Sequence, residues 1–221
     1  RLHQPEFTMV EWYRLGMQLD EIVADTTGVI RAALDMEIGV SELDYRAAFI
    51  AACDIDPLTA DISELTDAAG ADDELRAAVG AERDDWLDLL LATRVIPGFT
   101  PGQLTVLRHY PASQAALARL CPDDDRVADR FEVFLGPVEL ANGYVELTDA
   151  AEQARRIEAD NEARQRRGRP VRPVDELLLA AMEAGLPECA GVALGLERLQ
   201  MLFNKTDDIG NVITFTFRDD A

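Results

Sequence analysis

The chain has 221 residues, of which 48% are hydrophobic and 29% are charged. This composition is typical of a globular domain with a buried core, and it excludes a disordered chain. No apolar run is long enough to span a bilayer, and residues 1–6 lack the pattern of a signal peptide. The chain has no initiator Met, so we expect it to be part of a longer protein.

The 42 acidic and 21 basic residues give a net charge of −21. A nucleic-acid-binding protein usually has a basic footprint, because phosphate contacts dominate its affinity. The missing footprint argues weakly against tRNA as a partner, because an acidic surface also serves solubility in a salty cytoplasm. The three cysteines lack metal-site spacing, which favours the cytoplasm and argues against zinc.

The first half of the chain is predicted to be mostly helical. Residues Glu6–Tyr13 are rich in aromatic and β-branched side chains and predict a strand. From about Leu19 to Ala92 the pattern is helical, Ala-rich and acidic. We interpret residues 35–94 as an acidic helical insertion at the rim of a site. A short strand is predicted at Leu104–Tyr110.

The second half mixes strands and helices. Two strands, Phe131–Leu135 and Val138–Leu147, are predicted around a Gly-Pro turn. Asn142-Gly143 is a bulge signal inside the second strand. The other expected elements are a helix at 150–167, a helix at 174–184, a strand at 191–194, a helix at 196–203 and a strand at 211–217. Together they predict an α+β domain on a mainly antiparallel sheet.

Strand alternation places Phe7, Met9, Glu11 and Tyr13 on one face of the first strand. A carboxylate in such an apolar row is unusual for a core, because burying an unpaired carboxylate is costly. The plain alternative is an edge strand with Glu11 in solvent, and for this strand taken alone that alternative is favoured.

The second strand pair repeats this feature. Asn142, Tyr144 and Glu146 share one face, and Glu132 and Glu139 flank the hairpin. Paired carboxylates can hold Mg²⁺ between phosphate oxygens, and a partly buried carboxylate can bind an ammonium group. An exposed acidic hairpin explains the pattern equally well.

A buried strand is predicted to enter a helix through Gly195, with Arg198 in the first helical turn. Such junctions bind anions through free backbone N–H groups and the helix dipole, and an arginine fork suits phosphate. The alternative is an ordinary helix start with a solvated Arg198. The residues alone therefore indicate a carboxylate-rich site that can bind phosphate, but they do not define a reaction.

Three segments resemble class II aminoacyl-tRNA synthetases of the lysyl type. Residues 1–14 (RLHQPEFTMVEWYR) resemble the second half of motif 2, and residues 191–198 (GVALGLER) resemble motif 3. Residues 131–147 (FEVFLGPVELANGYVEL) are similar to the strand that holds the metal and the amino acid. The resemblance implies a class II antiparallel sheet flanked by helices and truncated at its N-terminus, with residues 1–221 forming a partial core from motif 2 onward.

The resemblance also implies an ATP site with Mg²⁺. His3 and Phe7 would lie at the adenine, with Phe7 stacked on the ring. Glu132 and Glu139 would hold Mg²⁺ at the phosphates, and Arg198 would bind the γ-phosphate. The implied reaction is adenylation of an amino acid, with Arg198 and Glu139 as its catalytic groups.

The implied substrate is a lysine-like amino acid. Glu11, Tyr13 and Glu146 would recognise its side-chain ammonium group. Asn142 would lie near its carboxylate, and Tyr144 would wall the pocket. No covalent enzyme intermediate is implied.

Within the family, the sequence is most similar to the ligases that attach (R)-β-lysine to elongation factor P. Residues 11–14 and 187–195 resemble the ligase pattern, and Ala141 stands where the synthetases resemble each other in having Gly. The Ala141 methyl group would narrow the pocket and favour a β-amino acid over lysine. The implied acceptor is a lysine of elongation factor P, with tRNA less favoured.

The sequence departs from the family pattern in several places. Gln4 replaces the usual Asn, and Glu197 replaces the commoner Asp. The Arg that opens motif 2 and the dimer-forming motif 1 are absent, so we expect the chain alone to be inactive and the full-length protein to be a homodimer. A lysyl-tRNA synthetase catalytic domain is one alternative, and an inactive paralogue that binds ATP or a partner protein is another.

Overall fold

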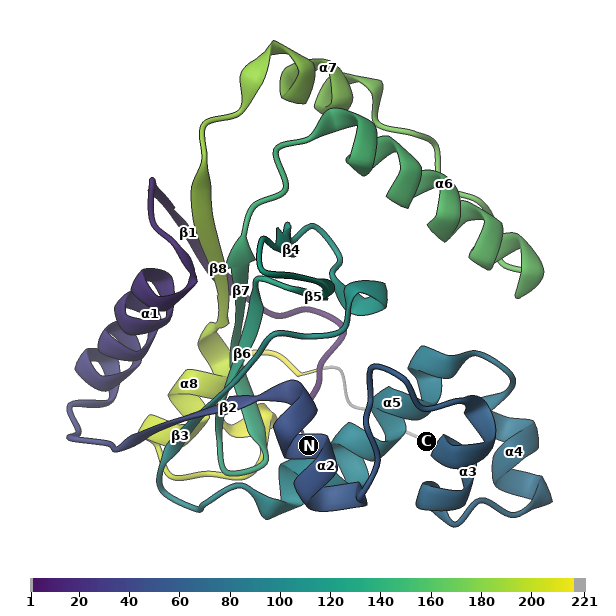
Figure 1. The fold of residues 1–221 in the computed structure, drawn as a ribbon. Coiled ribbons are helices and arrows are strands. Elements are labelled where there is room, and N and C mark those ends of the chain that lie inside the picture. Colours follow the sequence, from purple (N-terminus) through teal and green to yellow (C-terminus); the bar gives the residue numbers. More distant parts are fainter. Residues whose placement is uncertain (1, 217–221) are drawn as a thin grey trace.

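A six-stranded sheet forms the centre of the computed structural model, which describes residues 2–216 (Figure 1). The strand order is β1-β8-β7-β6-β3-β2. The strands are β1 (Met9–Leu15), β2 (Val40–Asp44), β3 (Leu104–Arg108), β6 (Arg130–Leu135), β7 (Val138–Val145) and β8 (Cys189–Gly195). Neighbouring strands are antiparallel except β2 and β3, which are parallel. The predicted α+β class with a mainly antiparallel sheet is confirmed.

Helices cover both faces of this sheet (Figure 1). They are α1 (Leu19–Leu34), α2 (Tyr45–Cys53), α3 (Ile62–Ala69), α4 (Asp73–Val79), α5 (Arg83–Leu90), α6 (Ala150–Arg166), α7 (Glu176–Gly185) and α8 (Leu196–Phe203). A π turn (Leu91–Val95) continues α5, short 3₁₀ turns lie at Ile96–Gly98, Ala112–Gln114 and Ile209–Asn211, and β4 (Leu120–Cys121) pairs with β5 (Asp124–Ala128). Among the described residues, no helix has both the length and the apolar character needed to cross a membrane.

The first core lies between the sheet and the helices α1 and α8. Ile22 and Ile30, two helical turns apart on α1, are fully buried against strand residues such as Val106 and Val133. Leu199 of α8 closes the same core. The buried part of this face is apolar and stabilises the fold. Arg108, on the same side of the sheet, pairs with Asp20 of α1.

The second core belongs to the helical body, which we define as α2 to α5 with the π turn. Tyr45, Phe49 and Trp86 are fully buried there and pack with Leu107 and Phe134, whose side chains come from the other face of the sheet. The helical body therefore covers β3 and β6 on that face. It leaves the same face of β7, β8 and β1 free of this core.

The predicted insertion at 35–94 is helical only from Tyr45 onward. Residues Val40–Asp44 form the edge strand β2, because they pair in parallel with β3 from a distant part of the chain. Asp44 ends the strand and caps α2, since its carboxylate accepts hydrogen bonds from the backbone N–H groups of Arg46 (3.0 Å) and Ala47 (3.4 Å).

The predicted last strand is also wrong within the described residues. Residues Ile209–Asn211 form a 3₁₀ turn, in which the Asp208 carboxylate accepts a hydrogen bond from the N–H of Gly210 at 2.9 Å. Residues 212–216 form no strand, and Phe217 lies outside the described residues. The short hairpin of β4 and β5 was not predicted from the sequence.

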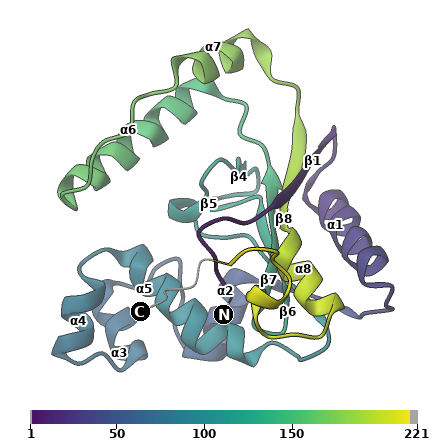
Figure 2. The same ribbon diagram turned by 180° about the vertical axis from the view of Figure 1, so that it is seen from behind.

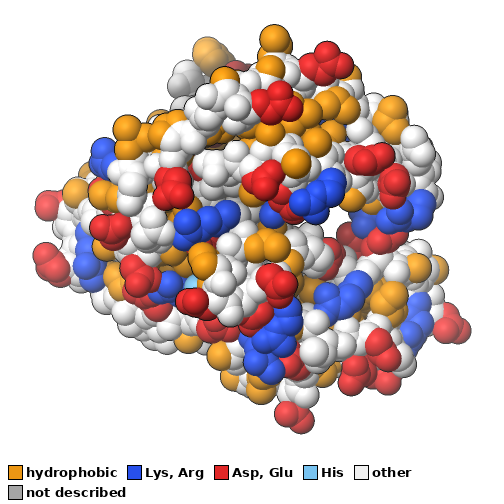
Figure 3. All heavy atoms as spheres, turned by 45° about the horizontal axis from the view of Figure 1, so that its top comes forward, with side chains coloured by type: hydrophobic (Ala, Val, Ile, Leu, Met, Phe, Trp, Pro, Cys, Tyr) orange, Lys and Arg blue, Asp and Glu red, His pale blue; other side chains and the backbone are white. Residues whose placement is uncertain are grey.

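The helices α6 and α7 form an arm that leaves the sheet between β7 and β8 and extends toward the helical body (Figure 1). Its tip contacts that body through Arg167, whose Nη2 lies 3.1 Å from Asp85 Oδ2. Acidic and basic side chains are interspersed over the face of the molecule seen in Figure 3. No continuous basic surface appears on that face, as the composition predicts.

Candidate functional site

Two hollows adjoin each other on the sheet face left free by the helical body. The wide groove has a volume of about 290 Å³, and its lining includes His3, Phe7, Glu139, Asn142, Ala193 and Arg198. The narrow pocket has a volume of about 70 Å³, and its lining includes Glu11, Tyr13, Asn142, Tyr144, Glu146 and Gly191. Asn142 and Ala193 line both, so the two hollows are continuous.

The strand register explains why these side chains meet. Glu11 pairs with Ala193, which pairs on its other side with Asn142. In the same way Tyr13 and Tyr144 flank Gly191. The small residues of β8 therefore form the floor between two rows of larger polar side chains. The structure places the predicted face of β1 beside the predicted face of β7, where side chains from both line the narrow pocket.

Gly191 keeps the narrow pocket open. A Cβ atom at this position would lie 2.7 Å from both Glu146 Oε1 and Tyr13 Cε1, which is closer than real Cβ atoms approach other atoms. Any side chain here would displace the two groups expected to bind the ligand. The predicted edge strand is also present, since β1 is the first strand of the sheet and Tyr13 is 61% exposed.

A β-bulge aligns Glu139 with Asn142. The register between β6 and β7 shifts where Ala141 pairs with Val133 but Glu139 pairs with Phe134, so Leu140 is the extra residue. Residues three apart on a regular strand face opposite sides of the sheet. The extra residue reverses this, and Glu139 and Asn142 both line the wide groove.

The bulge predicted at Asn142-Gly143 is therefore misplaced. Both residues pair regularly, Asn142 with Glu132 and Gly143 with Phe131. Gly143 serves close packing instead, since a Cβ there would lie 2.6 Å from the Phe131 ring and 2.8 Å from a backbone oxygen. Packing of this kind leaves no local sequence signal that separates it from a bulge.

Arg198 projects into the wide groove from the first turn of α8. Its Nη1 donates to the backbone oxygen of Glu139 at 3.0 Å and to Glu139 Oε2 at 3.3 Å, and its Nη2 lies 3.4 Å from His3 Nδ1. Phe7 lines the same groove and is 60% exposed. The structure thus brings together His3, Phe7, Glu139 and Arg198.

The segment before β1 is fixed to the start of α8. The Glu197 carboxylate accepts hydrogen bonds from the N–H of Thr8 at 2.9 and 3.0 Å, and the Leu196 N–H donates to the Thr8 oxygen at 3.0 Å. Although desolvation opposes it, these hydrogen bonds lower the pKa of Glu197. The contact places this segment beside α8, as the view from behind shows (Figure 2).

Glu132 lies on the same sheet face but is set back from the groove. Its side chain is 13% exposed, it lines neither hollow, and its Oε1 lies 2.6 Å from Arg130 Nη2. Burial raises the pKa of Glu132, the nearby Arg130 opposes this, and the charge of Glu139 adds to it. Two acids on one face fit the oxygen ligands that Mg²⁺ prefers, with Glu139 at the groove and Glu132 behind it.

The narrow pocket is electrostatically prepared for a cation. Desolvation raises the pKa of Glu146 from its ordinary 4.5 to about 7. Burial, with a contribution from the charge of Glu146, raises the pKa of Tyr144 to about 12. Burial also raises the pKa of Tyr13, and the charges of Glu146 and Glu11 add to this. No Lys or Arg of residues 2–216 lines this pocket. A bound ammonium group would favour the ionised form of Glu146, which desolvation disfavours.

Ala141 does not lie in the pocket where the family resemblance placed it. Its side chain is 1% exposed and belongs to the first core, on the opposite face of β7 from the hollows. Its methyl group therefore does not narrow the pocket directly, because strand alternation directs it toward α1 and α8. Any influence of Ala141 on a ligand would have to pass through the backbone of β7.

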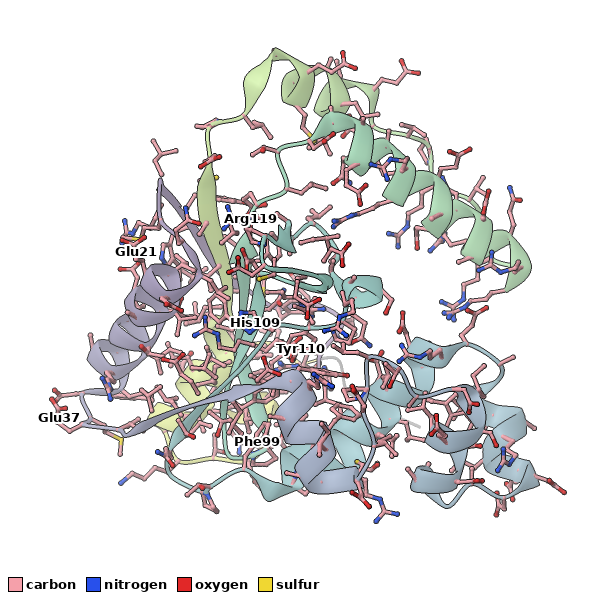
Figure 4. All side chains as sticks on the ribbon, in the orientation of Figure 1. Glu21, Glu37, Phe99, His109, Tyr110 and Arg119 are labelled. Atoms are coloured by element: carbon pink, nitrogen blue, oxygen red, sulfur yellow. The ribbon has the colours of Figure 1, made fainter. Side chains whose placement is uncertain are left out.

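A second cluster of metal-type ligands lies away from the groove. Candidate ligand atoms of His109, Cys121 and Asp129 lie within 4.8 Å of one another, although the cysteine spacing gives no hint of this. Two of the three already have charged partners: Asp129 Oδ2 lies 2.8 Å from Arg119 Nε, and His109 Nδ1 lies 3.1 Å from Asp44 Oδ2. Figure 4 shows His109 near the middle of the molecule. We assign no metal to these residues.

The sheet, the bulged acidic hairpin and the arginine at the strand-to-helix junction define a class of nucleotide-using enzymes. The chain matches the family model described as tRNA synthetases class II (D, K and N) over residues 1–218. It belongs to this family, which confirms the resemblance of the three sequence segments.

Curated relatives narrow the comparison. The chain is 46% identical over 217 residues to the elongation factor P–(R)-β-lysine ligase of Klebsiella pneumoniae (strain 342). It is 47% identical over 216 residues to the ligase of the same name in Proteus mirabilis (strain HI4320). These alignments cover 98% and 97% of the chain. The chain spans 66% of the length of each of these relatives.

Proposed function

We propose that the full-length protein activates a lysine-like amino acid with ATP and transfers it to a lysine of elongation factor P. One observation carries the proposal: a pocket lined by carboxylates and phenols opens, at Asn142, into a groove lined by an aromatic ring, an acid and an arginine. This order matches a substrate with an ammonium group at one end and a carboxylate that must meet ATP. The names of the relatives support the same substrate and acceptor.

ATP would occupy the wide groove. Phe7 is available to stack on the adenine, with His3 beside it, and Arg198 would bind the γ-phosphate. Arg198 is already fixed by Glu139, so its guanidinium group needs little reordering before it meets a phosphate. Glu139 and Glu132 would hold Mg²⁺, whose charge offsets that of the phosphates when it is bound.

The amino acid would occupy the narrow pocket. Glu146, Glu11 and Tyr13 would receive its side-chain ammonium group, and Tyr144 would form a wall. Asn142, at the junction of the two hollows, would donate a hydrogen bond to its carboxylate. An ammonium group favours the ionised form of Glu146, so binding near neutral pH should release a proton.

The reaction has two balanced steps. A substrate carboxylate oxygen attacks the α-phosphorus of ATP, and pyrophosphate leaves with the electrons of the broken P–O bond. An acceptor amine then attacks the acyl carbon of the adenylate, loses a proton and displaces AMP. Catalysis rests on positioning and on fixed charges, without a covalent enzyme intermediate. The proposal includes a homodimeric protein in the cytoplasm.

Amino-acid-dependent pyrophosphate exchange by the full-length protein tests the first step. We expect exchange with (R)-β-lysine, and weaker exchange with L-lysine. The second step is tested by offering elongation factor P and tRNA-Lys in parallel. Acylation of tRNA alone would support a lysyl-tRNA synthetase. Absence of exchange with either lysine would contradict the proposal and favour the inactive paralogue.

A further inference from the structure

Arg130 makes an unusual set of contacts beside the groove. Its three guanidinium nitrogens each have a different partner: Nε donates to Asn142 Oδ1 at 3.0 Å, Nη1 to the backbone oxygen of Gln114 at 2.6 Å, and Nη2 to Glu132 Oε1 at 2.6 Å. The Arg130 side chain is only 17% exposed. A lysine could not make these contacts, because its single ammonium group cannot reach three separated acceptors.

The guanidinium group is fixed from the other side as well. It lies over the ring of Tyr110, with Cζ 4.4 Å from the ring centroid, and Tyr110 is 2% exposed. Gln114 is itself anchored, since its Nε2 donates to Asp88 Oδ1 of α5 at 2.8 Å. Tyr110 lies centrally, between the sheet and the helical body (Figure 4). Arg130 thus connects the helical body with the strands that build the site.

The contact with Arg130 determines which way the Asn142 amide faces. An arginine side chain can only donate hydrogen bonds, so the Asn142 atom at 3.0 Å must be the oxygen. The amide nitrogen then occupies the other branch of the side chain. No described residue accepts a hydrogen bond from it. Asn142 lines both hollows, so this free donor lies at their junction.

We propose that Arg130 is a positioning residue that holds Asn142 with its amide nitrogen toward the junction of the two hollows, ready to donate to the carboxylate of the amino acid. The inference rests on the proposed function and adds a residue that the sequence pattern did not indicate. Arg130 acts through Asn142 and does not touch the substrate. Without it, the amide can turn over and present its oxygen, which repels a carboxylate.

The test measures binding in the absence of nucleotide and Mg²⁺, so that any effect of Arg130 on metal binding by Glu132 is left out. Calorimetry compares (R)-β-lysine and L-lysine with 1,5-diaminopentane, which has the side-chain ammonium group but no carboxylate. The variants are Arg130→Lys, Asn142→Ala and the double variant. Arg126→Lys is the matched control, because Arg126 pairs with Asp124 on β5 and lines neither hollow.

We expect Arg130→Lys to weaken amino-acid binding about tenfold, the usual effect of losing a hydrogen bond to a charged group. Diamine binding should stay within twofold. The double variant should bind the amino acid no more weakly than Asn142→Ala, because the two residues act as one unit. The inference would be overturned if the double variant bound the amino acid more weakly than Asn142→Ala by the full factor seen for Arg130→Lys. It would also be overturned if a folded Arg130→Lys variant bound the amino acid within twofold of the wild type.

Asn142→Asp provides an arm that keeps Arg130 and its contacts in place, in case Arg130→Lys fails to fold. The aspartate can still accept from Arg130, but it turns a second oxygen toward the carboxylate. We expect amino-acid binding to fall more than tenfold with diamine binding retained. Equal weakening of both ligands, or of neither, would overturn the inference. If the wild type binds the diamine but neither amino acid, the proposed function fails along with it.

Discussion

The two faces of strand β7 show how one short segment serves two purposes. Ala141 and Val145 are 1% and 2% exposed and pack in the first core with α1 and α8. Tyr144, and Glu146 directly after the strand, alternate with them and face the narrow pocket, and burial raises the pKa of both. Residues on one face should therefore determine stability, and residues on the other should determine ligand chemistry.

Arg198→Ala should show most strongly that activity and stability depend on different faces of the sheet. Removing a preorganised cation at a phosphate site costs about 10²–10³ in rate. Arg198 belongs to neither core, so the melting temperature should change little. Pyrophosphate exchange and thermal unfolding measure the two effects, with Arg126→Ala as the control. A large loss of stability in Arg198→Ala would contradict the division between the faces.

Leu194→Ala should show the opposite behaviour. Leu194 is 2% exposed in the first core, directly beside Ala193, which lines both hollows. Loss of a buried leucine costs about 2–5 kcal/mol of unfolding free energy. Denaturant unfolding measures this cost, with the 85%-exposed Leu177→Ala as the control. At a temperature where the variant is folded, exchange should stay near the wild-type rate. A loss of exchange as large as that of Arg198→Ala would show that the faces are coupled.

Glu146→Gln should weaken binding of the lysine-like amino acid about 10- to 100-fold above pH 7, because it removes a charged partner of the ammonium group. The wild-type affinity should itself fall as the pH drops below about 7, where Glu146 becomes protonated. The variant should lack this dependence. Titration calorimetry from pH 5.5 to 8.5 checks it, with the exposed Glu158→Gln as the control. The same pH dependence of binding in the wild type and in Glu146→Gln would exclude Glu146 as the titrating group.

The same substitution should raise stability at alkaline pH. The folded pKa of Glu146, about 7, lies above its ordinary 4.5, so the folded state holds this proton more tightly than the unfolded state. Its contribution therefore falls as the pH rises from 4.5 through 7, and the ionised group destabilises the fold above that range. Glu146→Gln should melt higher than the wild type at pH 8 and equally at pH 4. Thermal melting curves of the wild type and the variant at pH 4 and pH 8 measure this difference in stability.

Ala141→Gly should have the smallest effect. Glycine in a strand interior costs roughly 0.5–1 kcal/mol relative to alanine. Because the methyl group points into the first core, we expect the ratio of (R)-β-lysine to L-lysine activation to stay within twofold. Parallel exchange assays measure that ratio. A changed preference would show that the β7 backbone transmits packing from one face to the other.

The sequence predicted the parts of the site that follow from local alternation or from the family motifs. Glu11 and Tyr13 share a face, as do Tyr144 and Glu146, because the side-chain period of a strand is two. That these two faces meet depends on β8, whose small residues lie between them, and only the family order suggested that arrangement. Arg198 followed from the strand-to-helix junction.

Features that depend on distant pairing could not be predicted in this way. Residues Val40–Asp44 lie among helices in the sequence and form a strand only because β3 is available beside them. The role of Arg130 depends on Gln114 and Asn142, which are brought to it by different strands and turns. Ala141 was assigned to the pocket from the family resemblance, whereas strand alternation from Asn142 and Tyr144 places its side chain in the first core.

The single extra residue at Leu140 adds a side chain to the core without moving the acid of the groove. Removing Leu140 would leave a regular hairpin, in which Glu139 still pairs with Phe134 and stays on the same face as Asn142. The cost of such a deletion would fall on the first core, because Leu140 is 2% exposed and packs there. One inserted residue thus lets neighbouring positions of a short strand serve the interior and the groove at the same time.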